Sequence, residues 1–170
     1  DAAFARQAFL AGAAGYVLDP TVFPNAAALK ANAQLGRLTV SRSTGNSDGD
    51  GDFDRIDVFG SRSFSIWNAA TGALVFDSGD AFERTVAAAL PASFNASNTN
   101  NTLDNRSDDK GPEPEAVEVA QIGDRYFAFI GLERIGGVMV YDVTDPANST
   151  FVQYLNNRNF AQAPGAGTGG

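Results

Sequence analysis

The sequence contains neither cysteine nor histidine. These two absences exclude disulfide bonds, cysteine nucleophiles, zinc sites with thiolate or imidazole ligands, and every Ser-His or Cys-His catalytic relay. A bound metal ion must therefore use oxygen ligands. The chain also lacks any apolar run close to the roughly 20 residues that span a bilayer, so we expect no membrane insertion.

Positive charge is scarce: 12 basic residues face 20 acidic ones in a chain of 170 residues, and the net charge is −8. This balance argues against nucleic acid as a partner. Two segments carry the excess. Residues 43–58 hold five aspartates against one arginine, and residues 104–118 hold six acidic side chains against two basic ones, so each segment carries −4. Such clustering costs free energy unless solvent or a cation relieves the repulsion.

Short segments with aromatic, β-branched and alternating residues predict a mainly β fold. The expected strands are residues 37–41, 56–60, 63–67, 73–77, 116–122, 126–132, 137–143 and 150–155. Helices are expected at residues 25–33, with Asn25 as cap, and at 80–90, with Asp80 as cap; the alanine-rich residues 1–18 are also compatible with a short helix. Residues 92–115 are polar and aperiodic, which indicates a long loop.

The two sets of strands share a pattern, in which a glycine is followed by an arginine and then by an alternating strand. Arg62 and Arg134 occupy matching places, as do Trp67 and Tyr141, which we interpret as core residues. The repeat predicts about two four-stranded antiparallel β-propeller-like blades, a partial propeller; an ordinary meander sandwich is the alternative. The chain then divides into an N-terminal segment, a first blade, an inserted helix and acidic loop, a second blade and a linker-like tail, at residues 1–34, 35–79, 80–115, 116–160 and 161–170. Two blades cannot close a ring, so the expected partners are the remaining blades of a larger propeller or copies of the chain itself.

Residues 46–57 follow the spacing of a twelve-residue calcium loop. Gly51 stands at the sixth position, where a sharp turn is needed, and Phe53 provides the apolar anchor. Spacing by two lets successive oxygens curl around one hard cation. The candidate ligands are Asn46, Asp48, Asp50, Asp52, Asp54 and Asp57. The flanking segments are strands, so the loop would be a structural calcium clip; an empty acidic turn is the alternative.

A second acidic cluster is a less specific signal. It consists of Asp108, Asp109, Glu113 and Glu115. Pro112 and Pro114 favour an extended backbone, in which Glu113 and Glu115 point the same way. These carboxylates could hold a cation, and Lys110, Arg62 and Arg134 could bind a phosphoryl group. Ion pairing between the two sets is the simpler interpretation.

Several longer strings resemble the bacterial choice-of-anchor I domain, above all 111-GPEPE-115 and 131-GLERIGG-137. The resemblance runs from about residue 19 to 160. It implies a secreted or cell-surface bacterial β-propeller, similar to the large atypical alkaline phosphatases and to the mesenchyme-specific cell surface glycoprotein group. The chain departs from the family at Ala116, where members commonly carry glycine.

Two functions are compatible with these features. The first is a calcium-stabilised extracellular β-propeller module that acts in binding or scaffolding. The second is part of a calcium-dependent phosphoesterase similar to alkaline phosphatase, with the second acidic cluster holding the metal. No residue is assigned a catalytic role, and we do not expect the isolated chain to be catalytic.

Overall fold

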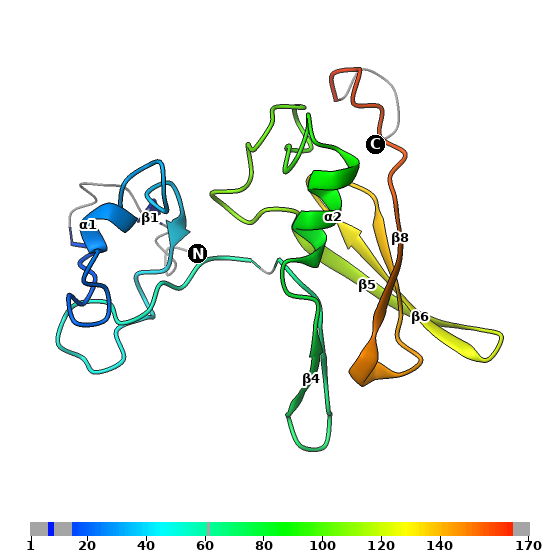
Figure 1. Ribbon diagram of the computed structural model, residues 1–170, viewed down its shortest axis with the longest axis horizontal. Helices are drawn as coiled ribbons and strands as arrows, with labels where there is room; N and C mark the ends of the chain where they lie inside the picture. Colours follow the sequence, from blue (N-terminus) through cyan, green and yellow to red (C-terminus); the bar gives the residue numbers. More distant parts are fainter. Residues whose placement is uncertain (1–6, 9–14, 61, 165–170) are drawn as a thin grey trace. The chain divides into compact units, whose positions relative to one another are not determined.

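A computed structural model describes residues 7–8, 15–60 and 62–164 of the chain. The helix expected within residues 1–18 lies mostly outside these residues, as does the end of the expected tail. The chain forms two compact units (Figure 1). The first unit comprises residues 1–60 and 108–110, and the second comprises residues 61–107 and 111–170.

The described residues of the first unit contain little regular structure. Its elements are strand β1 (Gln7–Ala8), helix α1 (Ala26–Leu29) and strand β2 (Thr39–Val40), and β1 pairs antiparallel with β2. The helix expected at residues 25–33 is a single turn, and the Asn25 side chain makes no capping hydrogen bond. The strand expected at residues 56–60 is reduced to one bridge between Val58 and Val40.

A small apolar core holds the first unit together. Tyr16 and Phe53 stack with ring centroids 4.1 Å apart, and Leu18 and Val40 are buried beside them. The Tyr16–Leu18 segment lies along Phe53: Phe53 N donates to Val17 O at 2.9 Å, and Asp19 N donates to Phe53 O at 3.1 Å. Backbone contacts thus bring residues 16–19 against the middle of the acidic loop.

The second unit begins with a hairpin of strands β3 (Ser65–Trp67) and β4 (Leu74–Asp77), followed by helix α2 (Ala81–Ala89). A four-stranded antiparallel sheet follows in the order β5 (Pro114–Ile122), β6 (Arg125–Leu132), β7 (Val138–Asp142) and β8 (Thr150–Leu155). The short 3-10 helix η1 (Pro146–Asn148) precedes β8. Neighbours in the sheet are consecutive in the chain, so the four strands expected between residues 116 and 155 form one antiparallel sheet, as predicted.

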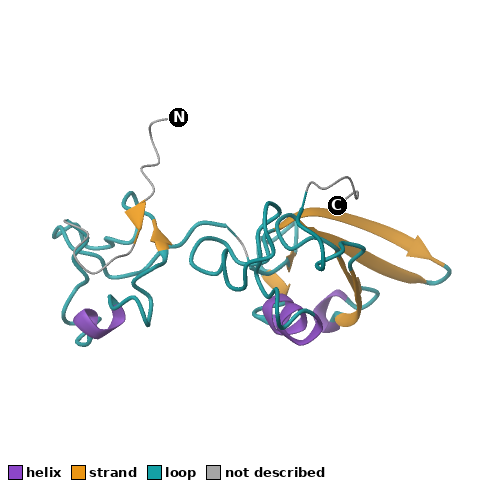
Figure 2. Ribbon diagram, turned by 90° about the horizontal axis from the view of Figure 1, so that it is seen from above, coloured by secondary structure: helices purple, strands orange, loops and turns teal. Residues whose placement is uncertain are grey.

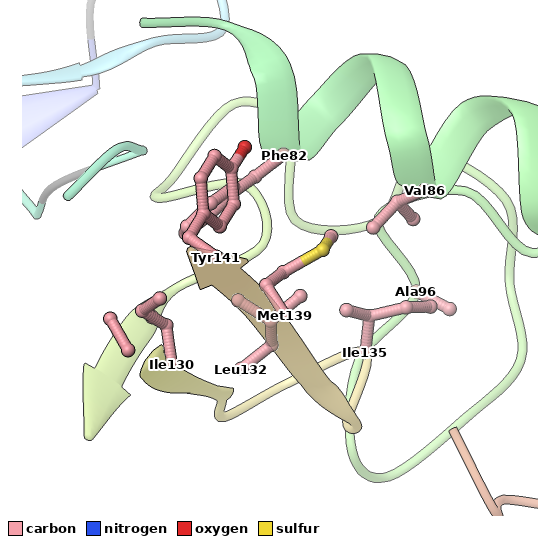
Figure 3. Packing of buried hydrophobic residues seen from close by; sticks show 9 residues of the cluster. Phe82, Val86, Ala96, Ile130, Leu132, Ile135, Met139 and Tyr141 are labelled. Atoms are coloured by element: carbon pink, nitrogen blue, oxygen red, sulfur yellow. The ribbon is translucent and has the colours of Figure 1, made fainter. Parts of the chain in front are cut away.

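Helix α2 covers one face of this sheet (Figure 2). Phe82 and Val86 from the helix are fully buried against Ile130, Met139 and Tyr141 from the sheet (Figure 3). Tyr141 is therefore a core residue as predicted. Trp67 is not: it is exposed on the hairpin, so its assignment to the core is wrong.

The mainly β class is confirmed, and the four-stranded meander is consistent with one propeller-like blade. Within residues 35–79 the described strands do not form one sheet of four, because β2 belongs to the first unit and the β3–β4 hairpin to the second. Among the described residues, no helix has the length and apolar character needed to cross a membrane.

Candidate metal centre and charged network

The acidic loop folds back on itself through hydrogen bonds from its own backbone. Asn46 Oδ1 accepts from Gly49 N at 2.6 Å, and Asp50 Oδ1 accepts from Asp52 N at 3.1 Å. Gly49 and Gly51 have φ of 84° and 105°, a region that glycine enters without strain. The two glycines therefore permit the tight turns that the sequence pattern requires.

The carboxylates at the end of the loop have specific partners. Asp54 Oδ2 accepts from Ser47 N at 2.6 Å and from Ser47 Oγ at 2.8 Å, and these bonds lower the pKa of Asp54. Asp57 pairs with Arg55 at 2.6 Å, and the hydrogen bond from Arg55 lowers the pKa of Asp57. Asp57 is thus engaged by an arginine of its own loop.

Three carboxylates converge at one place in the first unit: Asp19, Asp52 and Asp54 each offer an oxygen within 4.8 Å of the others. Asp52 Oδ1 is buried and has no hydrogen-bond partner among the described residues. Desolvation raises the pKa of Asp52, and repulsion from Asp50 and Asp19 adds to the shift. The hydrogen-bond donors at this site do not neutralise the charge of its three carboxylates. A divalent cation would reduce the repulsion between them.

Asp19 is the residue of this cluster that sequence reasoning missed. Asp19 lies 27 residues before the start of the 46–57 loop, so a motif defined by spacing within the loop does not include it. Asp19 Oδ1 accepts from Thr21 N at 2.5 Å, and its backbone is held by Phe53. The apolar Tyr16–Leu18 segment, followed by Asp19 and Pro20, was the available signal, because a buried segment places the next polar residue at the edge of the core.

The second acidic cluster is divided between the units. Asp108 and Asp109 belong to the first unit, where Asp108 pairs with Arg37 at 3.2 Å and Asp109 accepts from Thr39 Oγ1 at 2.9 Å. Lys110 belongs there too, and its side chain lies against Gly60.

Glu113 is the most buried carboxylate in the second unit, with an exposed fraction of 2%. Arg106 Nη2 donates to Glu113 Oε1 at 2.7 Å, and Arg134 Nε lies 3.4 Å from Glu113 Oε2. Glu115 and Glu133 each offer an oxygen within 4.8 Å of Glu113. Desolvation and a hydrogen bond with Glu113 raise the pKa of Glu133. Arg106 and Arg134 therefore offset only part of the negative charge of the three clustered carboxylates.

A second ion pair lies beside helix α2. Arg62 donates to Glu83 Oε1 at 2.5 Å and to Ser107 O at 2.6 Å. Buried Asn95 donates from Nδ2 to Glu83 Oε1 at 3.0 Å and to Ser107 Oγ at 2.9 Å. Both arginines considered for phosphate binding, Arg62 and Arg134, thus face carboxylates.

A comparison with protein families identifies the chain. The model of the choice-of-anchor I domain matches residues 6–146. The chain belongs to the choice-of-anchor I domain family. The resemblance carried by the GPEPE and GLERIGG strings is therefore confirmed.

Two curated relatives of this family domain are longer than the chain. Gigasin-3a from Magallana gigas is 38% identical over 115 residues, which cover 65% of this chain and 40% of that protein. The mesenchyme-specific cell surface glycoprotein of Strongylocentrotus purpuratus is 28% identical over 141 residues, which cover 75% of this chain and 18% of that protein. The chain therefore spans less than half the length of either relative. No solved structure matches the chain significantly.

Proposed function

We propose that this choice-of-anchor I domain is a calcium-stabilised extracellular surface module that acts in binding or scaffolding. Its family and the cell-surface name of one relative support an extracellular or surface location. A bacterial source, and a larger propeller of which this chain forms a part, remain predictions from the resemblance.

The observation that carries the calcium proposal is the convergence of Asp19, Asp52 and Asp54 around a buried, unpartnered Asp52 oxygen. Calcium takes about six to eight oxygen ligands, and carboxylates bind it through one or both oxygens. Three carboxylates, supplemented by backbone carbonyls and water, suit this requirement. The sequence offers no sulfur or imidazole ligand of the kind that zinc favours.

The architecture of the first unit gives such an ion a structural role. Among the residues of the first unit that the structure describes, regular structure amounts to two strands of two residues and one helical turn, and the buried apolar cluster has four members. Cores this small rarely stabilise a fold alone, and structural metals commonly supplement them. An ion between Asp19 and the 46–57 loop would fasten two segments that are remote in sequence.

The ion pairs of Arg62 with Glu83 and of Arg134 with Glu113 support a structural role for these arginines and not phosphate binding. Arg62 and Arg134 are each held by a carboxylate, so a phosphoryl group would have to displace an existing ion pair. We therefore favour the binding or scaffolding module over the phosphoesterase.

Thermal unfolding with and without calcium tests the proposal. Calcium at one hundred times its dissociation constant should stabilise the chain by about 2.7 kcal/mol. Asp52→Asn should abolish this response and leave the calcium-free protein equally or more stable, because it removes like-charge repulsion. Asp124→Asn, in a turn of the second unit, is the matched control and should keep the full response.

Asp48→Asn separates two ligand sets. A retained calcium response favours the Asp19–Asp52–Asp54 site, whereas a lost response favours the loop that the sequence pattern predicts. A wild-type chain that gains no stability from calcium would overturn the proposal.

A further inference from the structure

The acidic loop contains two adjacent Asp-Gly pairs, Asp48–Gly49 and Asp50–Gly51, and all four residues are exposed. An aspartate followed by glycine can react with its own backbone, because glycine has no side chain to shield the peptide nitrogen. Each pair is also followed by an aspartate at the next position. The two pairs therefore have nearly the same intrinsic reactivity, and a difference between them must come from the fold.

The carboxyl groups of the two aspartates lie in the same local arrangement. Asp48 Oδ1 accepts a hydrogen bond from Asp50 N at 3.3 Å, and Asp50 Oδ1 accepts one from Asp52 N at 3.1 Å. In each case the side chain bends toward the C-terminal side of its own residue, and the ring that the hydrogen bond closes contains the nitrogen of the intervening glycine. The position of the carboxyl group therefore does not distinguish the two pairs.

The hydrogen bonding of the two glycine nitrogens is different. Gly49 N donates to Asn46 Oδ1 at 2.6 Å. Gly51 N has no hydrogen-bond acceptor in the part of the chain that the structure describes. The nitrogen of Gly49 can attack a carbonyl carbon only after its hydrogen bond to Asn46 has broken, whereas Gly51 has only water to displace. Gly51 is therefore the more reactive nitrogen of the two.

We propose that Asp50 is a site of spontaneous isomerisation to isoaspartate, and that the hydrogen bond from Gly49 to Asn46 protects Asp48. Gly51 N attacks Cγ of Asp50 and loses its proton. A C–N bond forms, and one carboxyl oxygen leaves as water with that proton and a second one from the carboxyl group or the solvent. Water then reopens the succinimide ring. Opening at the former backbone carbonyl carbon leaves the main chain running through Cγ and frees the α-carboxyl group, with no net change in mass.

Isomerisation at this position would disturb the proposed calcium ligands. Isoaspartate adds one methylene carbon to the main chain, two residues before Asp52, and it removes the carboxylate that holds Asp52 N. The change would therefore alter the path of the chain that brings Asp52 to Asp19. This consequence rests on the proposed calcium site, whereas the isomerisation itself does not. A calcium ion held by Asp52 should restrain the loop and slow the ring closure.

Peptide mapping of the aged protein tests the proposal. The 170-residue chain is incubated at neutral pH with a calcium chelator, digested, and analysed by electron-transfer fragmentation, which distinguishes isoaspartate from aspartate. We expect isoaspartate to accumulate about fivefold faster at residue 50 than at residue 48, the factor to which the net free energy of one hydrogen bond corresponds. The same chain in concentrated urea is the control, because the two rates should become similar once the fold is removed.

Asn46→Ala tests the protecting hydrogen bond itself. It removes the acceptor of Gly49 N, so the rate at residue 48 should rise to about that at residue 50, which should stay unchanged. Ser47→Ala is the matched control and should leave residue 48 protected, because Ser47 does not contact Gly49 N. Equal rates at the two positions in the folded wild-type chain, or no isoaspartate at residue 50, overturns the proposal. A residue 48 that stays protected in Asn46→Ala also overturns it.

Saturating calcium gives a separate readout on the same samples. Slower isomerisation at residue 50 in calcium supports its link to the metal site. A rate that calcium leaves unchanged counts against the calcium site and leaves the isomerisation in place, so the failures of the two proposals are distinguishable.

Discussion

At the scale of single residues, Glu113 combines burial, charge and an unusual backbone. Its φ is 53°, a left-handed value that a non-glycine residue rarely adopts, and Pro114 follows it. The extended backbone that the two prolines led us to expect is therefore wrong at this residue. The strain persists because Arg106 and Arg134 hold the carboxylate and Glu133 N donates to Glu113 O at 2.9 Å.

Glu113→Gln should lower the free energy of unfolding by about 3–5 kcal/mol, because it removes the buried negative charge that Arg106 and Arg134 both contact. Urea denaturation measures this loss, provided that the dependence of the unfolding free energy on urea concentration is the same for the variant and the wild type. Glu115→Gln, two residues away and exposed, is the control and should change stability far less. Equal effects of the two substitutions would contradict a special role for Glu113.

Asp142 predicts a specific pH dependence. Hydrogen bonds from the Thr144 side chain and backbone, with the ion pair to Arg125, lower the pKa of Asp142 to about 2. A pKa lowered by folding means that the ionised group stabilises the fold above its usual pKa near 3.8, and that this stability is lost as pH falls toward 2. Asp142→Asn should therefore be less stable than wild type at pH 7, and the gap should close between about pH 4 and pH 2. A gap as large at pH 2 as at pH 7 would contradict this account.

At the scale of elements, local signals predicted the second unit well. The four strands of the meander match the expected segments within two residues, and helix α2 lies inside the expected range 80–90. Alternation and adjacent turns determine such strands, so the information is contained in neighbouring residues. The expected side-chain cap at Asp80 is absent, and Asp80 pairs instead with Arg84 at 3.1 Å.

The first unit was harder to predict because its pairings are remote in sequence. Strand β2 pairs with residues 7–8, and Thr39 N donates to Asp108 O at 2.9 Å. Asp19 reaches the acidic loop in the same way, through the backbone of Phe53. The spacing of the loop thus identified a region rich in oxygen ligands, but that spacing could not add Asp19, which lies outside the loop.

Helix α2 should contribute to stability through its buried face. Phe82→Ala should lower the free energy of unfolding by about 3–5 kcal/mol, because it empties space between the helix and the sheet. Arg84→Ala, on the exposed side, should cost less than about 1 kcal/mol, since its ion pair with Asp80 is screened by water. Denaturant titrations of both variants measure the two losses of stability. A loss for Arg84→Ala as large as that for Phe82→Ala would contradict the assignment of stability to the buried face of the helix.

At the scale of the whole molecule, the division into two units predicts a localised response to calcium. The proposed ligands all lie in the first unit, and the four-stranded sheet lies in the second. Hydrogen exchange followed by peptide mass spectrometry should show added protection in residues 15–60 on calcium addition and little change in residues 114–155. Protection spread equally over both ranges would contradict a site confined to the first unit.

The most direct measurement of the central claim is a calorimetric titration of the calcium-free chain with calcium. A single ion held by Asp19, Asp52 and Asp54 predicts one ion per chain. It also predicts that Asp19→Asn weakens binding by at least about tenfold, since each lost charge–charge contact removes more than a kilocalorie per mole. An absence of calcium binding, or binding that Asp19→Asn leaves unchanged, would contradict the claim.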